Sequence, residues 1–429
     1  MLLLAGVSAS VAMGLTSSIN FAWVCMMNST FPGSDRHIFS AYSFGGIFSL
    51  ALVGFLADRM GAKWMFTAGL TLAAVATALI PSAAALSYTY VAMLRVWVGM
   101  GVSLVLPISL SICSHWSTTA EFGKSFGILA SGMRLGPFFN QITATFLCEH
   151  THWKWIFYGS SLGSFAILIL WIYLYEEDPE NSKSISSTEK FYLLLNRERS
   201  TDPQPTPWLK ILKSLPVWAC VFSSFAYLYL NFLVSSFTPT FFAEVYASKT
   251  IENGFMSSAP LLAQVIGCWA AGCLSDFGFG SRSPSVPVKI VNSVALLGSS
   301  VVLLLLTLAI KNSATPLIAS FLLCAVKFLL SFVTGGFQKS ALLLAPQHSA
   351  PIGSIVNLAG MVATVILPYA VGMLTKGGSG AEWIHVFYTA IALCSVSAVV
   401  FLLFGSGEWQ NYDNLEADDN NETLLTEEF

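Results

Sequence analysis

The feature that most constrains this chain is a series of apolar stretches, each about as long as a lipid bilayer is thick. A helix needs about 20 apolar residues to cross a hydrocarbon core of about 30 Å, because backbone polar groups in lipid must be satisfied within the segment. Stretches of this kind occupy residues 2–27, 38–57, 64–86, 88–113, 124–147, 153–175, 216–242, 255–275, 287–310, 315–345, 351–375 and 383–405. We therefore predict an all-α membrane protein with twelve transmembrane helices.

Composition supports this class and argues against others. Hydrophobic residues make up 55% of the chain and charged residues only 10%, whereas roughly a quarter of the residues in soluble domains are charged. The net charge of -3 gives no basic footprint, so nucleic acid is not an expected partner. The eight cysteines include no CxxC pair, and we interpret them as helix-packing residues rather than a metal or redox site.

The first apolar run, from Leu2 to Val24, is predicted to be a retained membrane span. No basic segment precedes it, and it is too long for the core of a cleaved signal peptide. The chain opens directly within this helix, as a shortened gene model would.

The spans divide six and six about one long polar stretch. Within that stretch, Ser186 and Glu189 form a capping box, which predicts a short helix along the membrane surface. The predicted parts are an N-terminal six-helix half at 1–175, a cytoplasmic linker at 176–215, a C-terminal six-helix half at 216–405, and an acidic cytoplasmic tail at 406–429.

Basic residues in the loops predict the orientation, with both termini in the cytoplasm. The loops on that side hold Arg59, Lys63, Lys124, Lys183, Lys190, Arg197, Arg199, Lys210, Lys213, Arg282 and Lys289, and the outer loops hold Arg36, Lys154, Lys249, Lys311 and Lys376. This orientation places the sequence Asn28-Ser29-Thr30 outside, so Asn28 is a predicted glycosylation site. The membrane could be the plasma membrane or that of an intracellular vesicle.

A glycine and acid string recurs at equivalent positions of the two halves. It runs from Gly54 to Lys63 after the second span, and its shorter copy runs from Gly272 to Asp276 after the eighth. Glycine lets helices approach closely, and an aspartate at a helix end can pair with cations or a neighbouring helix N-terminus. We therefore predict a gating latch, although any tight turn also favours glycine and charge. Its residues are Gly54, Asp58, Arg59, Gly61, Lys63 and Asp276.

Basic residues inside the spans mark a candidate solute path. Arg95 stands in the fourth span, followed by Gly99 and Gly101, while Arg134 and Lys327 stand in the fifth and tenth. An arginine near a membrane centre costs about 2.5–3.5 kcal/mol on insertion scales, so such side chains should face a polar interior. The alternative for Arg95 is that its side chain reaches back to the membrane interface.

These motifs resemble those of the major facilitator superfamily. Within it, the chain is most similar to the anion and cation symporters, which include sialin, the vesicular glutamate transporters and the type I sodium/phosphate cotransporters. The similar residues occur in order through nearly the whole chain, including Met26 to Thr30, Trp153 with Phe157-Tyr158, Pro216 to Ala219, Gly335 to Phe337, Asn357 with Gly360, and Ser406 to Glu408.

The resemblance implies a secondary transporter that moves organic or inorganic anions by alternating access, coupled to Na+ or H+. Arg95 matches the family's span-four arginine, which is thought to face the anion. Val102 stands where proton-coupled members carry a glutamate, and Thr16 and Tyr227 stand where glutamate carriers have arginines. Glutamate is therefore not an expected substrate, and coupling could use sodium, use the membrane potential, or be absent.

We predict that a small-molecule anion binds midway between the halves. The predicted ligands are Arg95, Arg134, Tyr227, Asn20, Asn140 and Lys327. The asparagines could instead only bond neighbouring helices, an interaction worth about 0.6 kcal/mol. We expect a monomer without a cofactor.

Two other classes of function would also suit a polytopic membrane protein. The first is a receptor or sensor that retains the transporter fold without transport. The second is an enzyme, which is not expected because the chain has no HExxH, paired histidine boxes or GxSxG motif.

Overall fold

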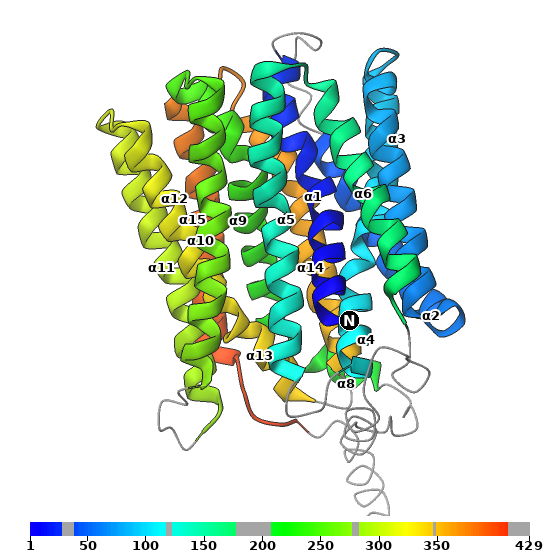
Figure 1. Ribbon diagram of the computed structural model, residues 1–429. Helices are drawn as coiled ribbons and strands as arrows, with labels where there is room; N and C mark the ends of the chain where they lie inside the picture. The colour runs from blue at the N-terminus through cyan, green and yellow to red at the C-terminus, as the bar shows by residue number, and fades with distance from the viewer. Residues whose placement is uncertain (28–37, 117–121, 177–206, 277–282, 346–348, 411–429) are drawn as a thin grey trace, which may run out of the picture.

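A computed structural model describes residues 1–27, 38–116, 122–176, 207–276, 283–345 and 349–410, and helices account for all of the regular structure in these ranges (Figure 1). Nine helical segments of these ranges are long and apolar enough to cross a membrane. The helices of the first half are α1 (Leu2–Met27), α2 (Ile38–Ala84), α3 (Tyr88–Ser103), α4 (Val105–Trp116), α5 (Phe122–His150) and α6 (Lys154–Leu174).

A short helix that was not predicted from the sequence precedes the second half. This is α8 (Trp208–Lys213), which bends at Ser214 into α9, and the indole of Trp218 donates a 2.7 Å hydrogen bond back to the carbonyl of Leu212. The surface helix predicted around Ser186 lies outside the described residues. The remaining helices are α9 (Leu215–Tyr246), α10 (Thr250–Asp276), α11 (Ser285–Lys311), α12 (Pro316–Leu330), the 3-10 helix η2 (Ser331–Thr334), α13 (Phe337–Leu344), α14 (Ser349–Leu374) and α15 (Gly380–Phe404).

One helix break separates two of the predicted spans, and two further breaks lie within single spans. Within α2, Gly61 adopts φ 70° and ψ 163°, a conformation that favours glycine, and this kink separates the second span from the third. The fourth span is two helices, α3 and α4, because Pro107 has no N–H to continue the ladder. The tenth is likewise divided, by η2 and the pair Gly335-Gly336. Helices therefore occupy the predicted spans at 88–113 and 315–345, and each of these spans has an interruption that was not predicted.

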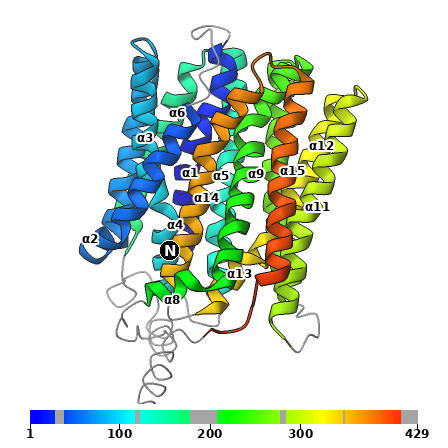
Figure 2. The same cartoon turned by 180° about the vertical axis from the view of Figure 1, so that it is seen from behind.

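The two halves repeat one packing pattern. In the first half α1 packs against α5 and α6, and in the second α9 packs in the same way against α14 and α15. The broken spans, α3 with α4 and α12 with α13, stand at the same place in each repeat. Across the molecule, α5 packs against α10, α2 against α14 and α1 against α9. In Figures 1 and 2, α3 lies at one edge, α11 and α12 at the other, and α1, α5 and α14 between them.

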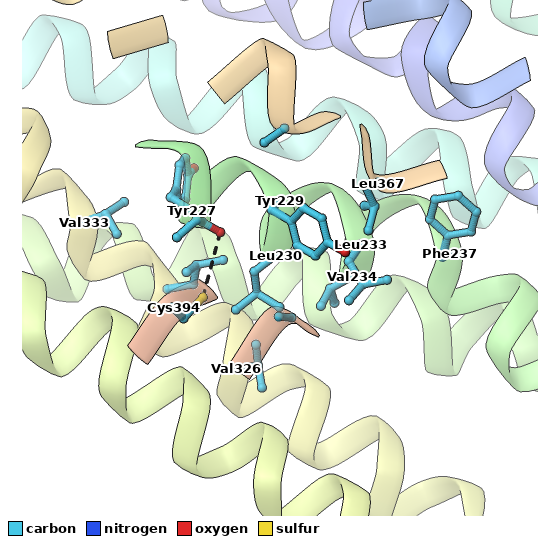
Figure 3. Close-up of a cluster of buried hydrophobic side chains, with 14 of the residues drawn as sticks. Tyr227, Tyr229, Leu230, Leu233, Val234, Phe237, Val326, Val333, Leu367 and Cys394 are labelled. Carbon is cyan, nitrogen blue, oxygen red and sulfur yellow. Dashed lines mark hydrogen bonds between the residues drawn. The ribbon is translucent and has the colours of Figure 1, made fainter. Parts of the chain in front are cut away.

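Helix α9 lies at the centre of the second half. Figure 3 shows one of its faces packed against residues of α12, α14 and α15. The thiol of Cys394 on α15 contacts the carbonyl of Ala226 on α9 at 3.8 Å. The apolar side chains of this cluster include Leu230, Leu233, Val234, Phe237, Val326, Leu367 and Cys394. This dry packing positions the polar residues on the remaining face of α9.

A disulfide joins Cys25 of α1 to Cys148 of α5, with a Cα–Cα separation of 6.5 Å. The prediction that all cysteines are helix-packing residues was therefore wrong for this pair. Disulfides persist in oxidising compartments, and both cysteines lie at the end predicted to face outside, which we call the outer end. The covalent link supports the predicted orientation.

Candidate functional site

Arg95 is buried in the first half rather than extended to the membrane interface. Its side chain is 1% exposed, and its Nη2 donates a 3.3 Å hydrogen bond to the carbonyl oxygen of Thr16 on α1. The guanidinium carbon lies 5.4 Å from the centre of the Tyr42 ring. Nε and Nη1 have no hydrogen-bond partner among the described residues. Arg95 is thus a buried cation with unused donors.

The glycine that follows Arg95 by one helical turn explains how α3 comes so close to α2. A Cβ atom built at Gly99 would lie 1.9 Å from the carbonyl oxygen of Tyr42. Since no side chain fits there, a glycine is required for the two helices to touch. Arg95 and Gly99 are four residues apart and so lie on the same face of α3. The close approach at Gly99 therefore places the arginine against the ring of Tyr42.

Lys327 is a second fully buried cation, on α12 of the other half. Its Nζ donates hydrogen bonds to the side-chain and main-chain oxygens of Asn231, at 2.6 and 3.1 Å. Further acceptors are Ser235 Oγ at 2.6 Å and Gln264 Oε1 at 3.2 Å. No described carboxylate lies among these partners.

Arg134 of α5 is half-buried and faces the second half. Its Nη1 lies 3.4 Å from the carbonyl oxygen of Ala130, and the guanidinium also interacts with the hydroxyl of Tyr227 on α9. Lys327 of α12 is close enough for its charge to act on this group. Arg134 and Lys327, one cation from each half, therefore lie within electrostatic reach of each other, and Arg134 also contacts Tyr227.

One turn of α1 connects the cation of the first half with the lysine of the second. Thr16 accepts the hydrogen bond from Arg95, and Asn20 donates a 3.2 Å bond to the carbonyl of Ser235. Ser235 in turn bonds Lys327 through its hydroxyl. Four residues along a helix correspond to a rise of about 6 Å. The predicted residues Arg95, Asn20 and Lys327 are thus brought together around α1.

Asn140 lies apart from this group. Its amide donates to the carbonyl of Gly14 at 2.7 Å and to Ser160 Oγ at 3.2 Å, both within the first half. These bonds are those of a residue that joins α5 to α1 and α6. The geometry favours the alternative in which Asn140 only bonds neighbouring helices.

The predicted latch is only partly within the described structure. Gly54, Asp58, Arg59 and Asp276 lie in helices whose side chains there are outside the described part. Gly61 forms the kink of α2, and Lys63 is half-buried, with its carbonyl accepting a 3.3 Å bond from the indole of Trp171. The glycosylation site predicted at Asn28 also lies outside the described residues.

Several residues of the polar group were missed from the sequence. Asn231 and Ser235 are one turn apart on α9, and Gln264 is a buried amide on α10. Amides within an apolar span are a usable signal, because an unsatisfied amide in lipid is costly. Tyr42 carries no such signal, since aromatic residues are common throughout these spans.

Comparisons with known proteins agree with this architecture. A family model described as Major Facilitator Superfamily matches residues 2–353. Sialin of Homo sapiens is 29% identical over 387 residues, covering 87% of this chain and 76% of that protein. Sodium-dependent phosphate transport protein 1 of Homo sapiens is 29% identical over 389 residues, covering 89% and 82%.

A solved structure supports the fold independently. The crystal structure of a D-xylose-proton symporter superposes with a TM-score of 0.73, covering 94% of this chain and 97% of that one. Its sequence identity is 14%, so the likeness concerns the fold alone.

Proposed function

The chain belongs to the Major Facilitator Superfamily, whose members are transporters rather than enzymes, and from this premise we propose that it carries a small organic or inorganic anion across its membrane. It is a multi-pass integral membrane protein whose relatives include anion transporters. The proposed mechanism is alternating access, in which the two halves rock about a substrate held between them.

The observation that supports an anion is the set of three cations inside the membrane region. Arg95 and Lys327 are fully buried and Arg134 is half-buried. None of them is paired with a carboxylate in the described structure. A buried charge without a partner costs several kcal/mol, so a bound anion would offset a penalty that the empty protein carries.

The three cations differ in how many of their N–H donors are already used in hydrogen bonds, and this difference indicates different roles. A guanidinium has five N–H donors and an ammonium has three. Arg95 uses one donor, on the carbonyl of Thr16, and Arg134 contacts Ala130 and Tyr227. Lys327 faces four acceptors, so its donors are saturated. We therefore propose that the arginines bind the anion directly and that Lys327 contributes charge without contact.

Hydrogen bonds between the halves supply contacts that alternating access must break. Gln141 Nε2 of α5 donates a 3.0 Å bond to Ser257 Oγ of α10. Toward the outer end, Ser40 Oγ of α2 donates to the carbonyl of Val365 of α14 at 3.0 Å. Each bond is worth about 1 kcal/mol, so a few of them can hold one state without locking it.

A non-transporting receptor or sensor is the rival proposal. It would use the same cations to bind an anion but would not move it. Binding therefore does not separate the two functions, and flux does.

The test is uptake by purified protein in proteoliposomes. The panel consists of phosphate, urate, sialate, nucleotides and acidic amino acids, with pH and sodium varied independently. We expect saturable uptake of at least one anion, and its loss in the double variant Arg95→Ala/Arg134→Ala. Binding without saturable flux for any member of the panel would favour the receptor, and absence of both would overturn the anion-carrier proposal.

A further inference from the structure

The surroundings of Lys327 have the composition of a site for a small monovalent cation. Four oxygen atoms lie 2.6–3.2 Å from its Nζ: the main-chain and side-chain oxygens of Asn231, Ser235 Oγ and Gln264 Oε1. All are neutral carbonyl, amide or hydroxyl oxygens, the ligands that hard cations prefer. They come from α9 and α10, while the cation comes from α12.

The two amides are oriented so that their oxygens face the ammonium. Gln264 Nε2 donates a 2.9 Å bond to Asn231 Oδ1, which leaves Gln264 Oε1 directed at Lys327. Asn231 Oδ1 accepts from both groups. Turning either amide over would place its NH₂ group against a positive charge. The cage of oxygens is therefore preorganised for a cation.

We propose that Lys327 is a tethered cation that permanently occupies this oxygen cage, so that the carrier needs no Na+ or K+ there. The ammonium is a compact point charge that can replace a monovalent ion among oxygen ligands. The cage is neutral, so one positive charge completes it and a divalent ion is not favoured.

The position of the cage explains why the charge of Lys327 matters for transport. Ser235, one of its ligands, accepts a 3.2 Å hydrogen bond from Asn20 of α1 through its carbonyl. Lys327 also lies within electrostatic reach of Arg134. A positive charge in the cage therefore acts on both the interface between the halves and the proposed anion site. In a cation-coupled carrier this charge would be present only while the ion is bound, whereas here it is covalently attached.

This inference rests on the proposed anion transport for its consequence, but the cage can be tested without transport. The first experiment measures thermal unfolding of purified protein in chloride salts of Na+, K+ and the large cation N-methylglucamine at equal ionic strength. The variants are Lys327→Ala, which opens the cage, and Lys311→Ala, which removes an exposed lysine at the end of α11.

We expect the unfolding midpoint of the wild type and of Lys311→Ala to be the same in the three salts. The midpoint of Lys327→Ala should rise with Na+ or K+ and saturate, because a free ion enters the vacated cage. Adding Gln264→Leu to Lys327→Ala should abolish that rise. A folded Lys327→Ala protein without a cation-specific rise would overturn the proposal.

The second experiment uses only the wild type, in case Lys327→Ala does not fold. Uptake of the transported anion is measured with external and internal Na+ and K+ replaced by N-methylglucamine, at fixed pH and membrane potential. The proposal predicts the same rates in N-methylglucamine as in Na+. A saturable requirement for Na+ or K+ would contradict it. Failure of all anion transport would refute the proposed function, while the thermal measurement would still decide the cage.

Discussion

The guanidinium carbon of Arg95 lies 5.4 Å from the centre of the Tyr42 ring, so adjacent helices of the first half hold a buried cation against an aromatic face. An interaction of this kind is worth about 0.5–2 kcal/mol. It fixes the position of the arginine without consuming its N–H donors. Arg95 can therefore be both buried and available to a ligand.

The Tyr42→Leu variant should weaken apparent substrate affinity about 2- to 30-fold, the range that loss of this contact corresponds to. The Tyr42→Phe variant keeps the ring and should stay within about twofold of the wild type. The measurement is the KM of anion uptake, normalised to folded protein. Equal effects of the two substitutions would show that the hydroxyl, not the ring, is what matters.

Asn140→Ala should lower stability and leave transport intact. The variant loses hydrogen bonds to Gly14 and Ser160 that join helices of the first half. The expected cost is about 0.5–2 kcal/mol. Thermal unfolding and uptake are compared on the same preparation. Loss of uptake at unchanged stability would instead make Asn140 a substrate ligand.

The disulfide between Cys25 and Cys148 should stabilise the outer ends of α1 and α5. Reduction, or the Cys25→Ser substitution, should lower stability by about 2–4 kcal/mol. A reducing agent should lower the unfolding midpoint of the wild type and have no further effect on the Cys25→Ser/Cys148→Ser variant. A midpoint of the wild type that does not respond, with both thiols shown to be reduced, would refute the stabilising role.

Alternating access predicts that tying α5 to α10 stops transport. Gln141 and Ser257 are hydrogen-bonded across the halves at 3.0 Å, so cysteines placed at both positions lie within reach of a short thiol-specific crosslinker that reduction cleaves. Uptake by Gln141→Cys/Ser257→Cys should fall at least tenfold when the two cysteines are crosslinked and recover on reduction, because the covalent tie prevents the separation that alternating access requires. Each single variant serves as the control. Full uptake by the crosslinked protein would show that these helices need not separate here.

Much of this fold follows from the sequence because lipid permits so few structures. Each stretch of about 20 apolar residues had to be a helix, and a helix lies at each of the twelve predicted spans. The division of the fourth and tenth spans was not predicted, although Pro107 and the pair Gly335-Gly336 mark the places. Apolar length alone does not show where a helix is interrupted.

The buried cations of the candidate site could be predicted, because burying a charge in the membrane costs free energy. The residues that contact those cations could not be predicted. Arg95 and Lys327 stood out because a cation in lipid needs an explanation. Their surroundings did not, because nothing in the sequence tells which face of α9 presents Asn231 and Ser235 to Lys327. The disulfide was missed for the same reason, since its cysteines are separated by 123 positions and lie in apolar runs.

The central claim, that an anion binds to Arg95 and is carried across the membrane, is tested most directly by counterflow in proteoliposomes. The transported anion is loaded inside, tracer uptake is measured, and Arg95→Ala is compared with the exposed-lysine control Lys311→Ala at equal amounts of folded protein. The account predicts saturable counterflow for the wild type and the control, and at least a tenfold loss for Arg95→Ala, as expected when a direct charge-assisted contact is removed. Undiminished counterflow and anion affinity in Arg95→Ala would contradict it.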